Sequence, residues 1–203
     1  NIPNEIHLVS AGLEYRDFVI IGILLEKSDF KNPEGNHELL DNWIYVQDKG
    51  VRMGRIQFFN NWSPYMVKDQ NTIWLGLEYF CTKGDALWNL SDEEFKQLGI
   101  LELNKIGLIN GNSTLDCTII RIEKAYPGYF GTYGDFDILK EFLDRYENLF
   151  LIGRNGMHKY NNTDHSMLSA MEAVKNINNN IKDKSNIWAV NTEEAYIEKK
   201  SAD

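Results

Sequence analysis

Apolar residues recur along the chain in two different rhythms, and each rhythm predicts a different kind of element. The first is the rhythm of β-strands, in which aromatic and β-branched residues dominate short segments bounded by polar turns. Segments of this kind lie at 15–27, 43–47, 55–59, 72–80 and 114–122. Because most of them follow one another through short connections, they favour an antiparallel sheet.

The second rhythm is helical and begins after residue 90. Ser91 and Glu94 have the spacing of a capping box, in which each residue bonds to the backbone of the other. Apolar residues at helical spacing predict helices at 91–108, 135–146 and 163–181. We expect a bend at Gly99 in the first of them. The predicted fold class is α+β (mixed α/β), with an antiparallel-rich sheet and flanking helices.

Composition describes an ordinary globular chain with an acidic balance. It has 203 residues, 43% of them hydrophobic, and a formal net charge of −9 with a pI near 5.0. Nucleic-acid binding needs clustered Lys and Arg, so this charge argues against it. No apolar run approaches the roughly 20 residues that span a bilayer, and the first residues do not read as a signal peptide. Cys81 and Cys117 lie in apolar strand contexts and are predicted to be reduced core thiols, which favours a cytoplasmic location.

The segment from 148 to 167 carries the pattern most typical of a ligand site. A short apolar strand is predicted at 148–152, and Gly153 and Gly156 then bracket a turn where the backbone can approach a ligand. Polar residues follow and cap the next helix. A helix N-terminus exposes unpaired N–H groups and a partial positive charge, so it favours an electron-rich group. An ordinary strand–turn–helix junction with a good cap would have the same pattern.

The spacing Gly153-Arg154-x-Gly156-x-x-x-Tyr160-x-x-x-Asp164 resembles the C-terminal flavin-contacting segment of UDP-galactopyranose mutases. These enzymes belong to the amine-oxidase and protoporphyrinogen-oxidase-like group of FAD enzymes. Two upstream segments, 52–64 and 124–127, resemble the same group in the same order. The resemblance covers roughly residues 13 to 180. It implies FAD as the cofactor and a small molecule as the substrate.

The resemblance also implies roles for individual residues. It places the turn over the isoalloxazine and points the N-terminus of the following helix at the N1 edge of the flavin, where a reduced flavin carries negative charge. Tyr160 would border the substrate. The mutases have an acidic residue and a Met at the two positions after Asn161, and this departure bears on the mutase assignment. The residues brought near the cofactor are Gly153, Arg154, Asn155, Gly156, Asn162, Thr163 and Asp164.

Arginines and aromatic residues supply further candidates for the substrate. Arg52 and Arg55 can clamp a diphosphate, because a guanidinium recognises phosphate through two parallel hydrogen bonds; solvated arginines at a strand edge are the alternative. Arg121 is the third candidate for a nucleotide-sugar diphosphate. His158 and His165 lack the spacing of a zinc-binding pair, so we expect no metal. The predicted substrate-binding residues are Arg52, Arg55, Asn61, Trp62, Tyr126 and Tyr160.

The G-x-G-x-x-G motif that opens a dinucleotide-binding domain is absent from the sequence. We therefore expect the chain to be the C-terminal part of a longer flavoprotein, inactive alone. Its apolar surface at 149–152 and 167–171 is expected to make it self-associate. The expected ranges are 1–12 as a remnant of the FAD-binding domain, 13–146 as the substrate-binding domain, 147–182 as the last strand, turn and helix of the Rossmann-like FAD-binding domain, and 183–203 as a polar tail anchored by Trp188.

Three functions remain open at this point. The leading hypothesis is an FAD-dependent oxidoreductase of the amine-oxidase type, in which a substrate carbon gives a hydride to flavin N5. The second is an isomerase of the UDP-galactopyranose mutase type, acting on a nucleotide sugar for cell-surface polysaccharide synthesis. The third is a non-catalytic binding module that keeps the fold.

Overall fold

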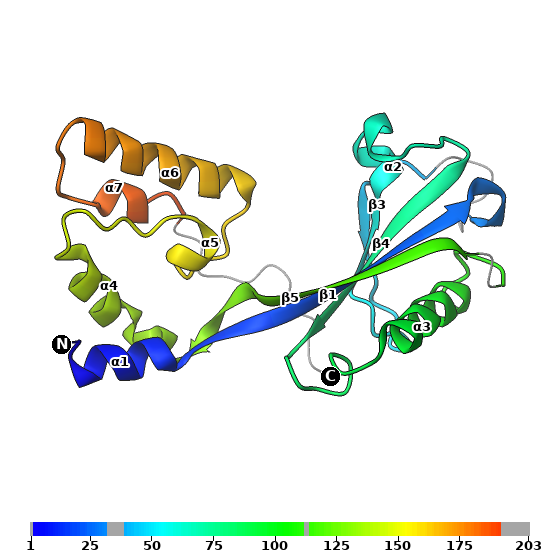
Figure 1. The fold of residues 1–203 in the computed structure, drawn as a ribbon, viewed down its shortest axis with the longest axis horizontal. Helices are drawn as coiled ribbons and strands as arrows, with labels where there is room; N and C mark the ends of the chain where they lie inside the picture. The colour runs from blue at the N-terminus through cyan, green and yellow to red at the C-terminus, as the bar shows by residue number, and fades with distance from the viewer. Residues whose placement is uncertain (1, 32–38, 112–113, 192–203) are drawn as a thin grey trace. The chain divides into compact units, whose positions relative to one another are not determined.

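The computed structural model describes residues 2–31, 39–111 and 114–191, and the chain divides into two compact units (Figure 1). Unit 1 contains residues 1–16 and 124–203, and unit 2 contains residues 17–123. Unit 2 is thus one continuous segment inserted between the two parts of unit 1.

The strands form one sheet in the order β2-β3-β4-β1-β5. β1 pairs antiparallel with β4, from Asp17 opposite Cys81 to Glu26 opposite Thr72. β3 pairs antiparallel with both β2 and β4. The mixed α/β class with an antiparallel-rich sheet is therefore confirmed. The strands are β1 (Leu13–Glu26), β2 (Trp43–Tyr45), β3 (Arg55–Phe58), β4 (Thr72–Cys81) and β5 (Thr114–Gly131).

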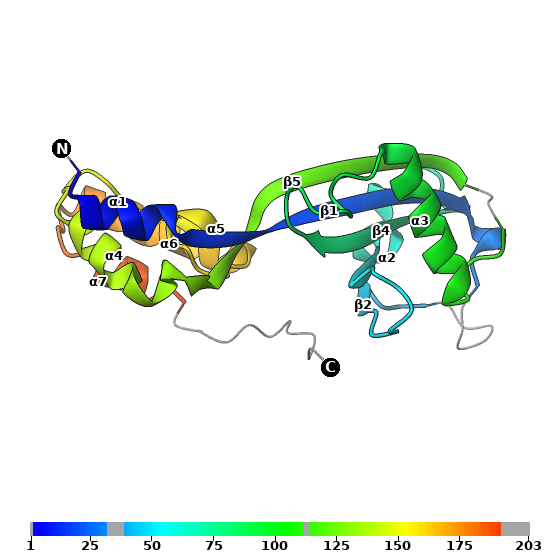
Figure 2. The ribbon, with the colours of Figure 1, turned by 90° about the horizontal axis from the view of Figure 1, so that it is seen from below.

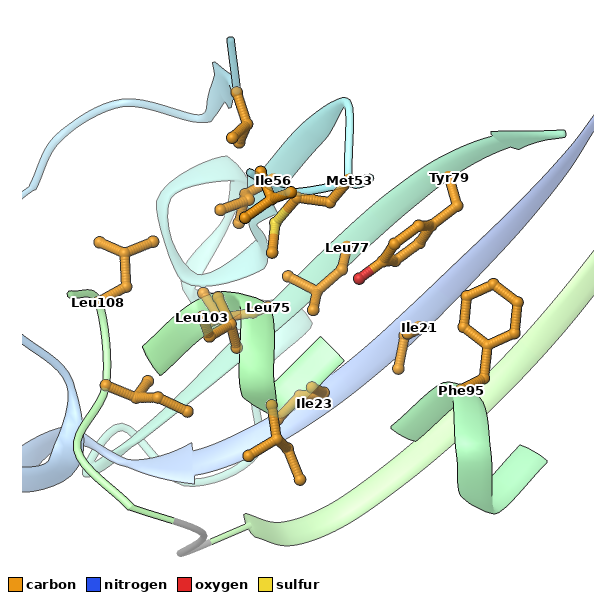
Figure 3. Packing of buried hydrophobic residues seen from close by; sticks show 14 of the residues in the cluster. Ile21, Ile23, Met53, Ile56, Leu75, Leu77, Tyr79, Phe95, Leu103 and Leu108 are labelled. Atoms are coloured by element: carbon orange, nitrogen blue, oxygen red, sulfur yellow. The ribbon is translucent and has the colours of Figure 1, made fainter. Parts of the chain in front are cut away.

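The main core lies between one face of this sheet and α3 (Asp92–Lys105), which covers that face (Figure 1, Figure 2). Ile21, Leu77 and Tyr79 on β1 and β4 are fully buried, as are Phe95 and Leu103 on α3 (Figure 3). The rings of Tyr79 and Phe95 meet edge to face, with centroids 5.0 Å apart. Removing such side chains from water contributes about 2 kcal/mol each, so this layer is the main stabilising element of unit 2.

Two features of α3 follow directly from its sequence. The Ser91 Oγ accepts a hydrogen bond from the Glu94 backbone N–H at 3.3 Å, and the Glu94 carboxylate accepts one from the Ser91 N–H at 2.8 Å, so the capping box is confirmed. The helix runs without interruption through Gly99 and ends at Lys105. A Cβ at Gly99 would lie 3.0 Å from a methyl group of Leu77, so this glycine serves close packing.

Unit 1 is mainly helical and has a smaller core of its own. Ile6 and Val9 on α1 pack against Leu139 on α4. The helix α1 was not predicted from the sequence. The helices of unit 1 are α1 (Asn4–Ala11), the 3₁₀ turn η3 (Thr132–Asp135), α4 (Phe136–Asp144), α5 (Gly153–Gly156), α6 (Thr163–Asn178) and α7 (Ser185–Trp188). Unit 2 also contains the short turns η1 (Lys27–Asp29), α2 (Phe59–Trp62) and η2 (Pro64–Met66).

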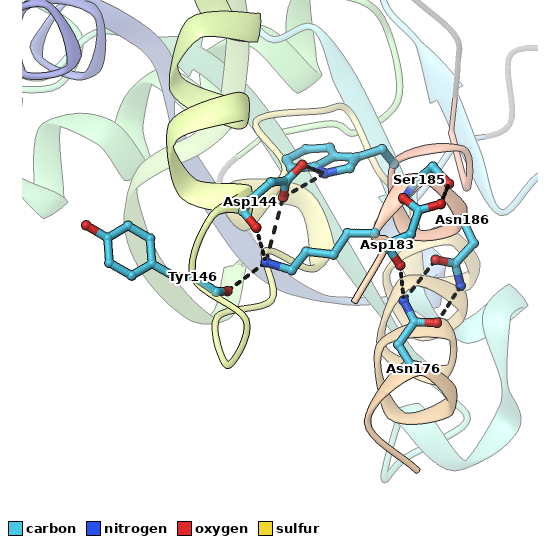
Figure 4. A network of polar contacts seen from close by, with 8 residues as sticks. Asp144, Tyr146, Asn176, Asp183, Ser185 and Asn186 are labelled. Atoms are coloured by element: carbon cyan, nitrogen blue, oxygen red, sulfur yellow. Dashed lines mark hydrogen bonds and ion pairs between the residues drawn. The ribbon is translucent and has the colours of Figure 1, made fainter. Parts of the chain in front are cut away.

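A polar network fastens α7 to the end of α4 (Figure 4). Lys184 is 4% exposed, and its ammonium donates to the carbonyl oxygens of Asp144 at 3.2 Å and Tyr146 at 2.8 Å. The Asp144 carboxylate accepts a hydrogen bond from the Trp188 indole N–H at 3.1 Å. Trp188 is buried, so it anchors the start of the predicted polar tail.

The predicted strand at 148–152 is wrong. These residues carry no strand, and among the described residues no neighbouring strand pairs with them. A β-strand needs a partner for its backbone N–H and C=O groups, and apolar side chains alone do not supply one. Leu149 and Ile152 remain 39% and 40% exposed. The last strand of a Rossmann-like domain is therefore not seen at this position.

The predicted domain limits at 12/13 and 146/147 differ from the limits of the compact units at 16/17 and 123/124. As a result α4 lies in unit 1, together with α1, and not with the sheet. The binding roles given to the ranges 1–12, 13–146, 147–182 and 183–203 stay predictions. Within the described ranges, none of the helices has both the length and the apolar character required to cross a membrane.

Candidate functional site

The turn formed by α5 presents open backbone at the start of α6. Gly153 has φ +70, a conformation that residues with a side chain rarely adopt. Its N–H donates to the hydroxyl oxygen of the buried Ser169 on α6 at 3.0 Å, which ties the turn to that helix. A Cβ at Gly153 or Gly156 would meet nothing closer than 3.9 Å and 3.6 Å. Both distances are ordinary van der Waals contacts, so a Cβ would not clash at either glycine, and Asn155 between them is exposed.

Arg154 lies against the rings of two tyrosines that stack on each other. Its guanidinium carbon lies 4.9 Å from the ring centroid of Tyr126 and 4.8 Å from that of Tyr160. The two rings are nearly parallel, 14° apart, with centroids at 5.5 Å. The guanidinium also donates to the carbonyl oxygens of Asn161 at 2.9 Å and Ala125 at 3.3 Å. Cation–π contacts and planar hydrogen bonding together fix the orientation of this cation. The structure thus brings together three predicted site residues.

Residues that the sequence did not single out support this cluster from behind. The Asn191 amide donates to the Asn161 side-chain oxygen at 2.9 Å and to the Tyr160 carbonyl at 3.0 Å. The Tyr129 hydroxyl accepts a hydrogen bond from the Tyr160 N–H at 2.7 Å. Asn161 and Asn191 are 1% and 4% exposed. Asn161 was predicted to cap the helix start, whereas Asn191 carries no sequence signal, because its role depends on a contact with a segment 30 residues away.

The first residues of α6 are exposed and follow the turn directly. Asn162 stands at the N-cap position, and its N–H donates to the His165 Nδ1 at 3.4 Å. Thr163 and Asp164 form the first turn and are exposed. The first N–H groups of a helix have no intrahelical acceptor, so this end of α6 presents donors and a partial positive charge. The negative charge of the Asp164 carboxylate neutralises part of this positive charge.

His158 lies buried behind the turn. It is 1% exposed, with its ring 4.8 Å from that of Tyr15 and 5.9 Å from that of Phe136. Its Nε2 lies 3.0 Å from the Gly128 carbonyl oxygen, so this nitrogen carries the proton and donates. The Nδ1 has no partner among the described residues. Desolvation by burial lowers the pKa of His158, although the Gly128 hydrogen bond opposes the shift. His158 is therefore a neutral structural residue.

The other predicted substrate residues belong to unit 2, whereas the cluster around Arg154 belongs to unit 1. The Arg55 Nε forms an ion pair of 2.5 Å with Glu78, whose carboxylate is fully buried. Asn61 donates to the carbonyl oxygens of Leu39 and Asp41, both at 2.8 Å. The Trp62 ring stays 42% exposed.

The arginines proposed for a diphosphate mostly have protein partners already. Arg55 is paired with Glu78. Arg121 donates to Asp92 at 2.6 Å and to the Leu90 carbonyl at 2.6 Å, so it fastens the loop before α3. Arg52 is exposed, and its backbone N–H donates to Glu102 at 2.6 Å. A diphosphate would have to compete with these carboxylates for Arg55 and Arg121.

Comparison with solved structures finds this fold in larger proteins. The chain is similar to a crystal structure of reduced UDP-galactopyranose mutase, with a TM-score of 0.71 and 20% identity, over 90% of this chain and 38% of that one. It is also similar to a protein from Exiguobacterium sp. 255-15 assigned provisionally as a protoporphyrinogen oxidase. There the TM-score is 0.53 and the identity 17%, over 73% of this chain and 32% of that one. No protein-family model and no curated protein matches the sequence.

At these identities the likeness establishes the fold. The chain has the fold of part of the mutase and oxidase structures, and it spans about two-fifths and one-third of their lengths. One is a mutase of the family that the 153–164 segment resembles, so the resemblance is confirmed at the level of the fold.

Proposed function

We propose that this chain supplies the substrate-side sheet and the last flavin-contacting turn of an FAD-dependent flavoenzyme. The observation that carries the proposal is the glycine turn beside the start of α6, with Arg154 oriented against the stacked rings of Tyr126 and Tyr160. The sequence resemblance of this turn and the fold likeness of the chain both support membership of one broad group of FAD enzymes.

The residues present fit a flat, electron-rich cofactor. Gly153 and Gly156 carry no side chain over the turn, and Gly153 lies beside Ser166 near the start of α6, whose exposed first turn offers N–H donors. Negative charge on a bound group is stabilised at such a helix end. Gly153, Arg154, Asn155, Gly156, Asn162, Thr163 and Asp164 are the residues that would hold the cofactor.

The chain's own residues would bind and orient the two reactants. FAD, when bound, supplies a carrier for two electrons. The guanidinium of Arg154 cannot lose its proton at neutral pH, so it contributes a fixed positive charge beside the turn. Tyr160 is half-buried, and its backbone is held by Tyr129 and Asn191, so its ring is well placed to border a substrate. A fixed cation and a fixed ring reduce the reorganisation needed when the substrate binds.

An oxidoreductase of the amine-oxidase type remains our leading assignment for the reaction. Such an enzyme needs a substrate carbon placed against the flavin and does not need a cluster of free cations. The ion pairs that occupy Arg55 and Arg121 agree with this requirement.

An isomerase of the UDP-galactopyranose mutase type is the second candidate. The observation that favours it is the higher TM-score of 0.71 and the 90% coverage of this chain in the mutase comparison. Its substrate would be a nucleotide sugar for cell-surface polysaccharide synthesis. Of the three predicted diphosphate candidates, Arg55 and Arg121 are paired with carboxylates, so Arg52 would be the first to test.

Flavin content of the complete protein, purified from its own gene, tests the proposal. We expect visible flavin absorbance with about one FAD per chain, and loss of most of it in Gly153→Ala, because a side chain is strained at φ +70. Gly134→Ala is the matched control, since a Cβ there meets nothing within 4 Å. A colourless wild-type protein that cannot be reconstituted with FAD would overturn the proposal and favour a non-catalytic binding module. Turnover of UDP-galactofuranose under reducing conditions would select the isomerase.

We also propose that the isolated chain self-associates. Met167 and Met171 on α6 are 62% and 64% exposed, and Leu149 and Ile152 add further apolar surface. Contiguous exposed apolar patches of this kind favour association. Sedimentation of the chain at increasing concentration should show a rising mass, and Met171→Lys should reduce it. A strictly monomeric profile at high concentration would contradict this proposal.

A further inference from the structure

Aromatic side chains gather on one face of the sheet at its β2 edge. In the antiparallel register Trp43 lies opposite Gln57, and Tyr45 lies opposite Arg55. Residues paired in this way, or two apart on one strand, point to the same face of a sheet. Ile56 points to the other face and is fully buried in the core. Trp43 and Tyr45 therefore face away from the core, and they are 42% and 51% exposed.

Trp62 completes this group from the short helix α2, which follows β3 directly. Its ring centroid lies 5.1 Å from that of Trp43, with the two planes tilted by 36°. Contact between the two indoles leaves 42% of each residue exposed to solvent. We call Trp43, Tyr45 and Trp62 the aromatic platform. Each of its members has an apolar ring and a polar N–H or O–H group, so the platform offers both stacking and hydrogen bonding.

The charges beside the platform cancel. The guanidinium of Arg55 lies 6.0 Å from the Trp43 ring and 5.8 Å from the Tyr45 ring. It is paired with Glu78, whose carboxylate is fully buried and also accepts a hydrogen bond from the Gln57 amide. The buried carboxylate fixes the arginine against the two rings and neutralises it. An anionic ligand would therefore gain little binding energy from Arg55, whereas the binding energy of an uncharged ring does not depend on a free cation.

Polar groups lie close to the platform in the sequence and the sheet. Gln57 shares the face of Trp43, and Asn61, next to Trp62, holds the exposed Asp41 backbone near the start of β2. A sugar ring has an apolar face of C–H groups and a polar edge of hydroxyls. Such a ring matches a surface of flat aromatic faces with amide, indole and phenol groups at the edges, because sites of this kind combine aromatic contact with a few polar groups.

We propose that the aromatic platform is a binding site for an uncharged carbohydrate. It binds a pyranose ring through stacking on the exposed face of one of the two tryptophans, with the hydroxyl groups of the sugar at the polar edges of the platform. This inference goes beyond the proposed flavin function and does not depend on it, because the platform lies in unit 2 and the flavin turn in unit 1.

Calorimetric titration of the complete chain with maltohexaose, cellohexaose and lactose tests the inference, with UMP as the anionic stacking probe. We expect saturable binding of at least one of the three sugars and none of UMP. Loss of a stacking aromatic costs about tenfold or more in affinity, so Trp43→Ala and Trp62→Ala should each weaken sugar binding to at least that extent. Trp43→Phe keeps a ring and should retain part of the affinity. Tyr146→Ala, which removes a 47% exposed aromatic from unit 1, is the matched control and should bind like the wild type.

Several results would overturn the inference. One is the absence of binding by all three sugars to a chain whose circular dichroism is that of a folded protein. Another is sugar binding that persists unchanged in both tryptophan variants. Binding of UMP that depends on Trp43 would make the platform a nucleobase site. A wild-type dimer that becomes a monomer in Trp43→Ala would make it an interface between two copies of the chain.

Discussion

The hydroxyl of Tyr79 on β4 donates a hydrogen bond of 3.0 Å to the carboxylate of Glu102 on α3, inside the core of unit 2. The same carboxylate accepts the backbone N–H groups of Arg52 at 2.6 Å and Met53 at 3.1 Å. Glu102 is 2% exposed, so this one side chain links the helix, a central strand and the segment before β3. Desolvation by burial raises the pKa of Tyr79, and the neighbouring Glu102 carboxylate raises it further. The phenol therefore stays protonated and can act as a donor.

Replacement of Glu102 should therefore destabilise unit 2 strongly. Glu102→Ala leaves two backbone N–H groups and a phenol without their acceptor, and we expect a loss of about 3 kcal/mol in the free energy of unfolding. Glu102→Gln should cost less, because an amide oxygen can still accept part of these bonds. Urea denaturation followed by circular dichroism measures both. Glu26→Ala, at the exposed end of β1, is the control. A loss from Glu102→Ala as small as that of the control would contradict this role.

Gly99→Ala should destabilise the protein although alanine favours helices. The helix propensity of alanine over glycine favours the variant by about 1 kcal/mol. Against this, the new methyl group would lie 3.0 Å and 3.1 Å from methyl groups of Leu77 and Ile21, which are fully buried and have no room to move. Overpacking of this kind costs about 1–3 kcal/mol, so we expect a net loss. Thermal unfolding of Gly99→Ala beside Gln97→Ala, on the same helix, measures it; a stabilised Gly99→Ala would show that α3 can shift from the sheet.

The elements with a clear local pattern could be predicted from the sequence. The strands at 15–27 and 72–80 and the capping box at Ser91 appear in the structure within a few residues, because alternation and capping chemistry act locally. The strand predicted at 148–152 failed for the opposite reason. An apolar run has the composition of a strand, but strand formation depends on a partner that composition does not reveal.

The candidate site shows the same limit. The glycine turn and the start of α6 were predicted, since Gly153 and the polar residues before the helix have local signatures. The roles of Arg55 and Asn191 could not be predicted, because each role depends on a contact with a segment distant in the sequence. Arg55 is taken up by Glu78, 23 residues away, and Asn191 reaches Asn161, 30 residues away. Spacing along the chain does not distinguish an arginine that has a carboxylate partner from one that is free for a ligand.

The stability of unit 1 should fall as the pH is lowered through the titration range of histidine. The pKa of His158 is lowered in the folded state, mainly by burial, whereas the unfolded chain has the ordinary value of about 6.5. The unfolded state then binds a proton more readily than the folded state. The stabilisation is complete above about pH 6.5 and is lost as the pH falls toward the folded-state pKa. Chemical denaturation between about pH 8 and about pH 5 measures the slope.

Two histidine variants separate this effect from the rest of the chain. His158→Asn removes the titrating group and tolerates the positive φ of 47, so its stability should depend less on pH. His7→Asn changes an exposed histidine on α1 and should leave the slope unchanged. An equal slope in wild type and His158→Asn would show that other groups cause the acid sensitivity.

Arg154→Lys should weaken unit 1 even though it keeps the positive charge. A lysine ammonium cannot lie flat against the stacked Tyr126 and Tyr160 rings and donate in a plane to the Asn161 and Ala125 carbonyls. We expect a loss of about 1–2 kcal/mol in the free energy of unfolding, from cation–π contact and hydrogen bonds together. Lys182→Arg is the control, because its surface ion pair with Glu147 contributes little. If Arg154→Lys matches wild type in stability while Arg154→Ala does not, the residue acts through its charge alone, and its planar contacts with the tyrosines are not what orders the turn.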